Sequence, residues 1–322
     1  MFGGQIPQLE SLTLSGFTRC PSGFLKSLKH LALRLPPGHP TVLTTKVVDL
    51  LTAAPNIEAL SLTSFLSVVD DSSPSHKATL PRLRNALLRG CDTVSILPRI
   101  AIPEGAQVHV SVDHRTLRSG TSQRSADLHI LLALPPSLGT HLFLPVYPKL
   151  TIEIGETLSR FTITLTGVGS AKLCLKISVC SGQIPLEFVR RSLEAIPCHA
   201  YLRTARHIAM SIPPTVPGIG WSSWLKKFAF AVELSVRALP AEVVLGALMR
   251  TDGDGLPVCP CLRHVEFYGS EFSARTLDPK WIAKLLLFRV ATGFSLEKIT
   301  VMERGVVQDY GQPAWLDGLL GN

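Results

Sequence analysis

The sequence predicts an α/β solenoid in which short parallel strands alternate with helices. Two observations support this fold class. A phrase of the form L-x-x-L-x-L returns along the 322 residues, and helical patterns lie between its copies. Self-similarity at intervals of about 20–50 residues is typical of chains that stack one supersecondary unit on the next. A strand, a turn, a helix and another strand in succession favour a parallel sheet.

The repeated phrase begins in Pro7–Leu14, where its apolar positions are Leu9, Leu12 and Leu14. Its later copies are Leu28/Leu31/Leu33, Ile57/Leu60/Leu62, Leu83/Ala86/Leu88, Leu262/Val265/Phe267 and Leu296/Ile299/Val301. The last two apolar positions are two residues apart, so both side chains point to the same side of a strand. We therefore expect a core lined by Leu12, Leu14, Leu60, Leu62, Leu88, Val265, Phe267, Ile299 and Val301.

One copy, Leu83–Cys91, has the L-x-x-L-x-L-x-x-C form of a leucine-rich repeat. The spacing of the copies is uneven: 19 residues separate Leu9 from Leu28, and 29 separate Leu28 from Ile57. Repeats of this class have about 20–29 residues. No copy has Asn in the last place of the phrase. The prediction is therefore an irregular leucine-rich-repeat-like solenoid, with repeats over about 6–105 and 200–305.

Helices and further strands are predicted between the copies. Apolar residues at helical spacing predict helices over Thr44–Ala54, Ala241–Arg250 and Trp281–Ala291. Apolar alternation predicts strands over His207–Ile212 and Phe228–Val236, although their register in the phrase is blurred.

The middle of the chain, about 106–180, departs from the repeat and is rich in predicted strands. These strands are Gln107–Asp113, Lys149–Ile154, Phe161–Thr166 and Lys172–Val179. We interpret the segment as a β-rich insert or a distorted run of repeats that packs against the solenoid. No Gly/Ser linker or charge block marks a boundary, so we predict a single domain over 1–322.

The composition, 46% hydrophobic and 17% charged, is that of a chain with a large buried core. The longest uncharged run, Leu128–Pro148, is about long enough to span a bilayer. Pro135 and Pro136 break it at its centre, where lipid would leave backbone groups unpaired. We therefore expect no membrane span.

The sequence also predicts a cytoplasmic or nuclear location. Met1 leads directly into a repeat, without the basic and apolar regions of a signal peptide. The seven cysteines are odd in number and scattered, and there is no N-x-S/T glycosylation acceptor. This usage fits a reducing compartment.

No motif predicts a metal, a cofactor or catalysis. Cys259-Pro-Cys261 is too closely spaced for a zinc half-site. Asp252-Gly-Asp254-Gly lacks the remaining ligands of a calcium loop and is interpreted as a turn.

Two further patterns have a simpler structural interpretation. His109, Ser111 and Asp113 share one strand face, about 7 Å apart in a straight line, without a nucleophile elbow or oxyanion donors. A polar outer face explains them. The run from Gly167 to Lys172 lacks the order of a phosphate loop, and a strand follows it rather than a helix. We expect a protein that is not an enzyme.

The chain carries a net charge of +8, and part of this charge lies in the segment from Arg82 to Arg124. Against three acids, that segment has seven arginines: Arg82, Arg84, Arg89, Arg99, Arg115, Arg118 and Arg124. A basic surface that binds nucleic acid or another polyanion is therefore the alternative function. The segment has no aromatic residue for base stacking and matches no nucleic-acid motif, which makes protein the favoured partner.

Three runs, Leu80–Cys91, Val258–Gly269 and Phe294–Val301, resemble the C-terminal leucine-rich-repeat region of fungal F-box proteins, in particular the divergent set of mushroom-forming basidiomycetes. In that family an N-terminal F-box docks on the adaptor of a cullin-based ubiquitin ligase, and the repeats select the protein to be ubiquitylated. The first repeat begins at residue 7 and no F-box-like helical segment precedes it. The resemblance thus implies docking on a ubiquitin-ligase adaptor only if an F-box lies upstream.

The expected binding surface is the open face of the strands. The residues between the buried positions must project from the opposite side, and stacking aligns them. The predicted protein-binding residues are Arg34, Asn85, Arg89, His264, Glu266 and Tyr268. Tyr and Arg dominate binding hot spots, so Tyr268 and the arginines are the expected anchors.

Overall fold

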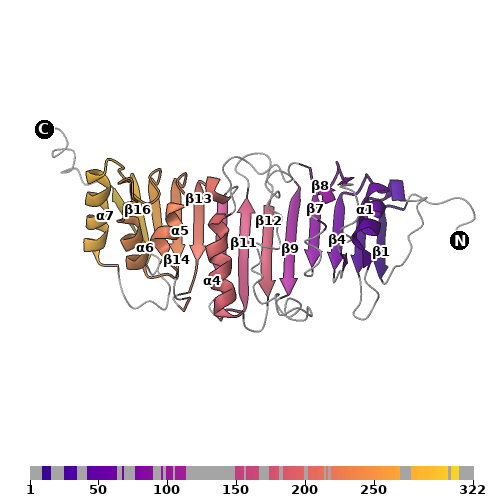
Figure 1. Ribbon diagram of the computed structural model, residues 1–322, viewed down its shortest axis with the longest axis horizontal. Coiled ribbons are helices and arrows are strands. Elements are labelled where there is room, and N and C mark those ends of the chain that lie inside the picture. Colours follow the sequence, from indigo (N-terminus) through magenta and orange to yellow (C-terminus); the bar gives the residue numbers. More distant parts are fainter. Residues whose placement is uncertain are drawn as a thin grey trace, which may run out of the picture. The chain divides into compact units, whose positions relative to one another are not determined.

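The segments with alternating apolar residues form strands, and most strands pair in parallel, so the chain is a mixed α/β protein (Figure 1). The structure is a computed structural model. In the part that it describes, no sheet closes into a barrel. The described residues are 9–15, 25–34, 42–63, 67–68, 77–89, 96, 99–103, 106–113, 149–155, 157–166, 174–180, 184–198, 202–213, 215–216, 219–268, 277–303 and 306–311.

The chain divides into two compact units. The first unit comprises Met1–Pro145 and Thr162–Ile184, and the second comprises Val146–Phe161 and Pro185–Asn322. The single domain over 1–322 stays a prediction, and each unit is described by itself.

The first unit is built on a sheet of mainly parallel strands (Figure 1). In spatial order they are β1 (Ser11–Ser15), β2 (His30–Arg34), β4 (Ala59–Thr63), β7 (Asn85–Arg89), β9 (Gln107–Asp113), β12 (Cys174–Cys180) and β11 (Arg160–Thr166), of which the first two residues belong to the second unit. The pairs from β1 to β12 are all parallel. The connections contain η2 (Leu25–Ser27), α1 (Thr44–Thr52) and the short pairs β3 (Val42–Leu43) with β5 (Ser67–Val68) and β6 (Ala78–Thr79) with β8 (Ile100–Ala101).

The register of these strands aligns equal positions of the repeated phrase. One row is Leu12, Leu31, Leu60, Ala86 and Val108, and the next is Leu14, Leu33, Leu62, Leu88 and Val110. From β2 to β9 these side chains are buried. Leu12 and Leu14 are only half-buried, which corrects the expectation for them. The reason is their position on β1, the edge strand, which has one neighbour in the described sheet.

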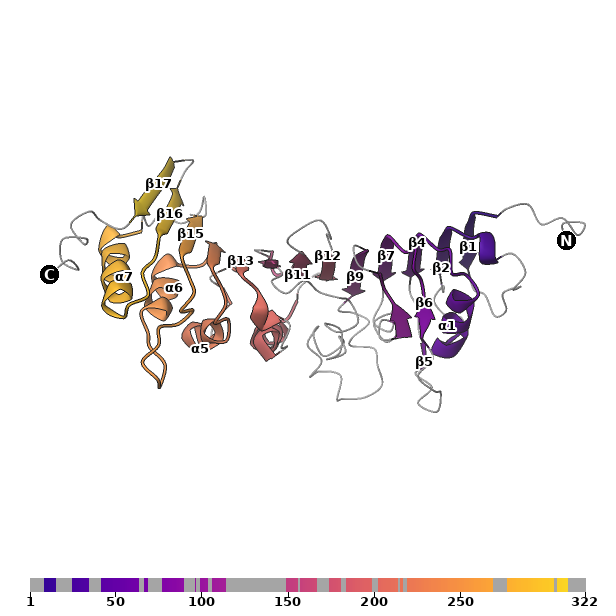
Figure 2. The same cartoon turned by 90° about the horizontal axis from the view of Figure 1, so that it is seen from above.

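Helix α1 covers the buried side of the first sheet. Its Val47, Val48 and Leu51 are at most 2% exposed, whereas Lys46 and Asp49 face the solvent. Figure 2 shows α1, β5 and β6 on the same side of the strands. The other side of the sheet stays open in the described part of the unit.

The second unit repeats this arrangement. Its spatial strand order is β10 (Lys149–Ile154), β13 (His207–Ser211), β14 (Glu233–Arg237), β15 (His264–Tyr268), β16 (Lys298–Glu303) and β17 (Val306–Gly311). Every pair is parallel except β16 with β17. The helical elements are α4 (Leu186–Ala195), η5 (Ile196–Cys198), η6 (Leu202–Thr204), α5 (Trp221–Lys226), α6 (Ala241–Leu248) and α7 (Pro279–Ala291). Figure 2 shows α5, α6 and α7 on one side of the strands.

The predicted helices agree with α1, α6 and α7 to within two residues. Helix α7 begins with Asp278 as its cap, whose Oδ1 accepts a hydrogen bond from the Lys280 backbone N–H, followed by Pro279 at the first helical position. The predicted strand Phe228–Val236 is wrong in its first half. Phe228 is buried in a turn, and β14 begins at Glu233.

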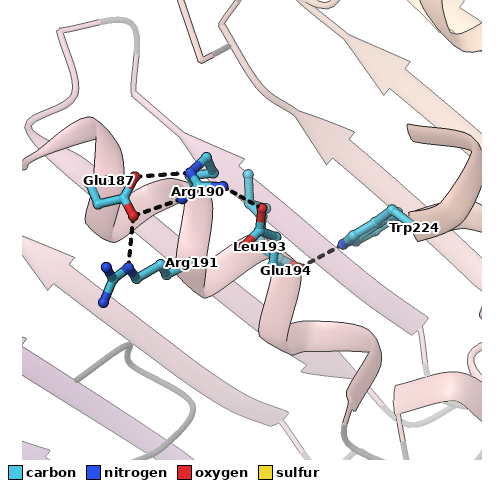
Figure 3. A network of polar contacts seen from close by, with 6 residues as sticks. All are labelled: Glu187, Arg190, Arg191, Leu193, Glu194 and Trp224. Carbon is cyan, nitrogen blue, oxygen red and sulfur yellow. Dashed lines mark hydrogen bonds and ion pairs between the residues drawn. The ribbon is translucent and has the colours of Figure 1, made fainter. Parts of the chain in front are cut away.

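Helix α4 was not predicted, although its sequence has a helical signature. Phe188, Val189 and Leu193 are buried on one side, and Glu187 lies three and four residues before Arg190 and Arg191 on the other. Both arginines donate hydrogen bonds to the Glu187 carboxylate, at 2.7–2.9 Å (Figure 3).

Helix α5 is joined to α4 by an aromatic cluster. Trp224 Nε1 donates a hydrogen bond to the backbone carbonyl of Leu193 at 2.6 Å (Figure 3). The Trp224 ring also contacts Trp221 and Phe228, with centroid separations of 5.7 and 4.6 Å. The aromatic and basic run from Trp221 to Phe228 is therefore part of the core packing of the second unit.

We predict that Leu62→Ala destabilises the protein by about 2–5 kcal/mol, because it leaves a cavity in a fully buried row. Leu12→Ala at the half-buried edge should cost clearly less. Denaturant unfolding of both variants measures the difference. Equal losses would contradict the position of β1 at the edge of the core.

We predict that the Glu187 carboxyl titrates far below its usual range. Hydrogen bonds from Arg190, and then from Arg191, lower the pKa of Glu187 to about 2. Because the pKa is lowered by folding, the contact stabilises the helix fully above the ordinary Glu value of about 4.3 and is lost as the pH falls toward 2. NMR titration of the side-chain carboxyl tests this. In Arg190→Gln/Arg191→Gln the pKa should return toward the ordinary value.

Candidate functional site

Each unit has one open sheet face, on the side of the strands away from the helices (Figure 2). The alternation that buries one set of side chains places the intervening residues on this face. In the described residues, most of these intervening side chains are half-buried or exposed, although Thr162 and Thr300 are buried. The two faces are therefore the surfaces on which side chains of several repeats meet.

The open face of the first unit contains a groove of about 500 Å³. The register arranges the outward residues in three rows across β1, β2, β4, β7 and β9. The rows are Ser11–His30–Ala59–Asn85–Gln107, Thr13–Ala32–Ser61–Leu87–His109 and Ser15–Arg34–Thr63–Arg89–Ser111. The groove lies over the first two rows.

This first face combines an apolar floor with a basic margin. Ala32 and Leu87 give the middle row two apolar side chains, and both line the groove. Arg34 and Arg89 are exposed in the third row, and neither has an ion pair with another described residue. The described side chains of the three rows include no carboxylate.

The open face of the second unit has a groove of about 560 Å³ over β10, β13, β14 and β15. Its rows are Lys149–His207–Glu233–His264–Lys298, Thr151–Ala209–Ser235–Glu266–Thr300 and Glu153–Ser211–Arg237–Tyr268–Met302. Unlike the first face, it contains both acids and bases.

The first of these rows has a glutamate between two histidines at its centre. Glu233 lies between His207, whose Nδ1 is 2.6 Å from Oε2, and His264, whose Nδ1 is 3.7 Å from Oε1. His264 Nε2 is in turn 3.0 Å from Glu297 Oε2. Partial burial raises the pKa of Glu233, but the hydrogen bond and charge of His207 and the charge of His264 outweigh it and hold the pKa below its usual value.

The second and third rows are joined by Glu266. Its Oε2 accepts hydrogen bonds from Ser235 Oγ at 2.8 Å and from the Tyr268 hydroxyl at 2.9 Å. The Arg237 guanidinium lies over the Tyr268 ring, 4.3 Å from its centroid, in a cation–π contact. Burial, together with the hydrogen bond to Glu266, raises the pKa of Tyr268. Tyr268 is thus held rigidly at the edge of the groove.

The structure places the six predicted binding residues on the two open faces. Arg34, Asn85 and Arg89 lie on the first unit, and the other three, His264, Glu266 and Tyr268, lie on the second. Within the second unit, His264 contacts Glu233, and Tyr268 donates to Glu266.

Sequence reasoning missed the contribution of β14 to the second face. Glu233, Ser235 and Arg237 all project from this strand. A signal existed, since Ala231, Leu234 and Val236 fit the repeated phrase and are all buried. The strand had been predicted five residues too early, which hid this register.

The residues weighed for catalysis or metal binding form no metal-binding group within the described part of the chain. His109 and Ser111 lie at outward positions on β9, and the side chain of Asp113 lies outside the described residues. The run from Gly167 to Lys172 also lies outside them. The same is true of three arginines of the basic segment, Arg115, Arg118 and Arg124. Asp252 closes the expected turn, because its Oδ1 accepts hydrogen bonds from the backbone N–H groups of residues 254 and 256.

Two buried polar side chains of the second unit, Cys259 and Arg289, lie away from the open face and contact backbone carbonyls. Cys259 is buried, its thiol donates to the carbonyl of Leu225, and burial raises its pKa to about 12. The fully buried Arg289 donates from Nη2 to the Cys259 carbonyl at 2.9 Å, which ties α7 to this turn.

No helix in the described residues is long and apolar enough to cross a membrane. The predicted interruption of Leu128–Pro148 lies outside those residues. Comparisons with protein-family models, with curated proteins and with solved structures find no match to the chain.

We predict that the two neighbouring cysteines of the second unit differ sharply in reactivity. Cys261 is exposed, whereas Cys259 is buried and its raised thiol pKa leaves it very little thiolate. Brief iodoacetamide treatment of the native protein should alkylate Cys261 and spare Cys259, as measured by peptide mass spectrometry. Unfolding in denaturant should make both react, and rapid native labelling of Cys259 would contradict its burial.

Proposed function

We propose that the chain is a non-enzymatic protein-interaction module, whose strands and helices form an irregular leucine-rich-repeat-like solenoid. It resembles the substrate-recognition part of an F-box ubiquitin-ligase adaptor, and it binds its protein partner on the open strand faces. Docking on a ubiquitin-ligase adaptor belongs to this proposal only for a chain joined to an F-box upstream.

The alignment of the outward rows is the observation that supports this function. Equal positions of the phrase pair across each sheet, so that Arg34 pairs with Thr63 and Thr63 with Arg89, and Arg237 pairs with Tyr268. Side chains that are distant in sequence thereby form continuous surfaces. Such surfaces are what stacked repeats use for binding proteins.

The dimensions and chemistry of the grooves also favour a protein segment. Each groove crosses four or more strands, and neighbouring strands lie about 4.8 Å apart. The grooves are therefore long and open to solvent. Exposed arginines and a rigidly held Tyr268 are the side chains that dominate protein–protein hot spots.

We predict that Arg89→Ala/Tyr268→Ala loses most of its protein partners. Truncation of a hot-spot Arg or Tyr typically costs about 2 kcal/mol or more, which is more than a tenfold loss of affinity. The test is capture of partners from a lysate of the source organism, quantified by mass spectrometry. The matched control is Lys46→Ala/Lys284→Ala, which alters exposed residues on the helical sides of the two units.

Equal capture by the face variant and the control would place the binding surface elsewhere. Titrating salt against the captured signal separates the alternative function, because phosphate neutralisation gives a steep loss of binding with salt. Recovery of nucleic acid with such a slope, in place of proteins, would contradict the proposal.

A further inference from the structure

We infer that the open face of the first unit selects an acidic, extended segment of a partner protein. This inference rests on the proposed function and assigns the chemistry of its partner. The observation behind it is a positive charge that no other described side chain of this face compensates, beside an apolar floor.

The charge of this face is one-sided. Its three rows across β1, β2, β4, β7 and β9 hold two arginines and, among the described side chains, no Asp or Glu. Among the acids whose side chains the structure describes, the nearest to the rows are Glu10 and Glu58, one residue before β1 and β4. Asp113 follows Ser111 by two residues on β9, beyond the rows, and its side chain lies outside the described residues. Arg34 and Arg89 are the last residues of their strands. The end of a strand is five positions beyond the level of Glu10 and Glu58, which is about 16 Å along the strand direction. Glu10 is already paired with Lys29 at 2.6 Å.

The second unit shows what a compensated face looks like. There Glu233 lies between two histidines, and Glu266 accepts two hydrogen bonds. Even Arg237 is engaged, over the Tyr268 ring. In the first unit, by contrast, the guanidinium groups of Arg34 and Arg89 are exposed and available for ligand carboxylates.

The geometry indicates what the partner segment must contain. Arg34 and Arg89 lie in one row with Thr63 between them, so they are two strand spacings, about 10 Å, apart. A guanidinium can grip a carboxylate with two parallel hydrogen bonds. Ala32 and Leu87 are two residues before them and offer an apolar floor about 7 Å away. The matching ligand has two carboxylates and an apolar side chain beside them.

A protein segment fits this face better than a nucleic acid. The described outward side chains include no Phe, Tyr or Trp on which bases could stack. Two arginines neutralise few phosphates, whereas nucleic-acid affinity grows with the number neutralised. The apolar floor would also contribute nothing to holding a phosphate backbone.

Selection from a phage-displayed random dodecapeptide library on the full 1–322 chain tests the inference. We expect the enriched peptides to contain at least two Asp or Glu and an apolar residue. Their affinity, measured by fluorescence anisotropy, should fall about tenfold or more in Arg34→Ala/Arg89→Ala, and equally when their acids are replaced by Gln or Asn. Selection on Arg34→Glu/Arg89→Glu should enrich basic peptides instead.

The matched control for Arg34→Glu/Arg89→Glu is Lys26→Glu/Lys46→Glu. It changes the net charge of the chain by the same amount as that variant, at exposed positions of η2 and α1. It should still select acidic peptides, and thermal melts should show all variants folded. Peptides without acids that depend on Leu87 or Tyr268 would overturn the inference and leave the proposed function standing. Tighter, arginine-dependent binding of an oligothymidine probe would overturn it in favour of nucleic acid. Failure to enrich any peptide would overturn both.

Discussion

The architecture of both units depends on one constraint, the burial of every second strand residue in rows that run across the sheet. In the first unit the rows are built on Leu31 and Leu33, and in the second on Leu234 and Val236. Side chains alternate with a period of two, so a slip of one residue would turn a buried row onto the open face. The same alternation therefore determines the core and, on the opposite side, the surface available for binding.

The register is fixed where each strand begins. In the first unit the backbone N–H of Lys29 donates to the Glu10 carbonyl, that of Glu58 donates to Lys29, and that of Arg84 donates to Glu58. The second unit has an equivalent series, in which the Glu297 N–H donates to the carbonyl of Arg263. Side-chain charges at these positions add to the pairing only weakly, because they are exposed and screened by salt.

The sequence was sufficient to predict the strands wherever the apolar spacing was clear, as in β9 and β15. It did not predict that Leu12 would be only half-buried, because burial depends on which strand lies at the edge of the sheet. The outward position of Glu266 followed from alternation alone. The hydrogen bond that Glu266 accepts from Ser235 could not be predicted from alternation, because it depends on the register of β14 with β15. The turn around the buried Phe228 makes β14 begin further toward the C-terminus than predicted.

The two open faces share the same arrangement of parallel strands but differ in their outward side chains. The buried rows and the helices that cover them supply most of the packing, so outward residues such as Arg34 contribute little to folding. Those residues are therefore free to differ between the units. On the second face they form a network in which Glu233 lies between two histidines and Glu266 accepts two hydrogen bonds, whereas on the first face Arg34 and Arg89 have no ion pair with another described residue. A charged ligand gains more from a face whose charges are still unpaired, because binding there breaks no existing ion pair. Electrostatic selectivity should accordingly reside on the first unit, and the second should contribute a rigid polar surface centred on Tyr268.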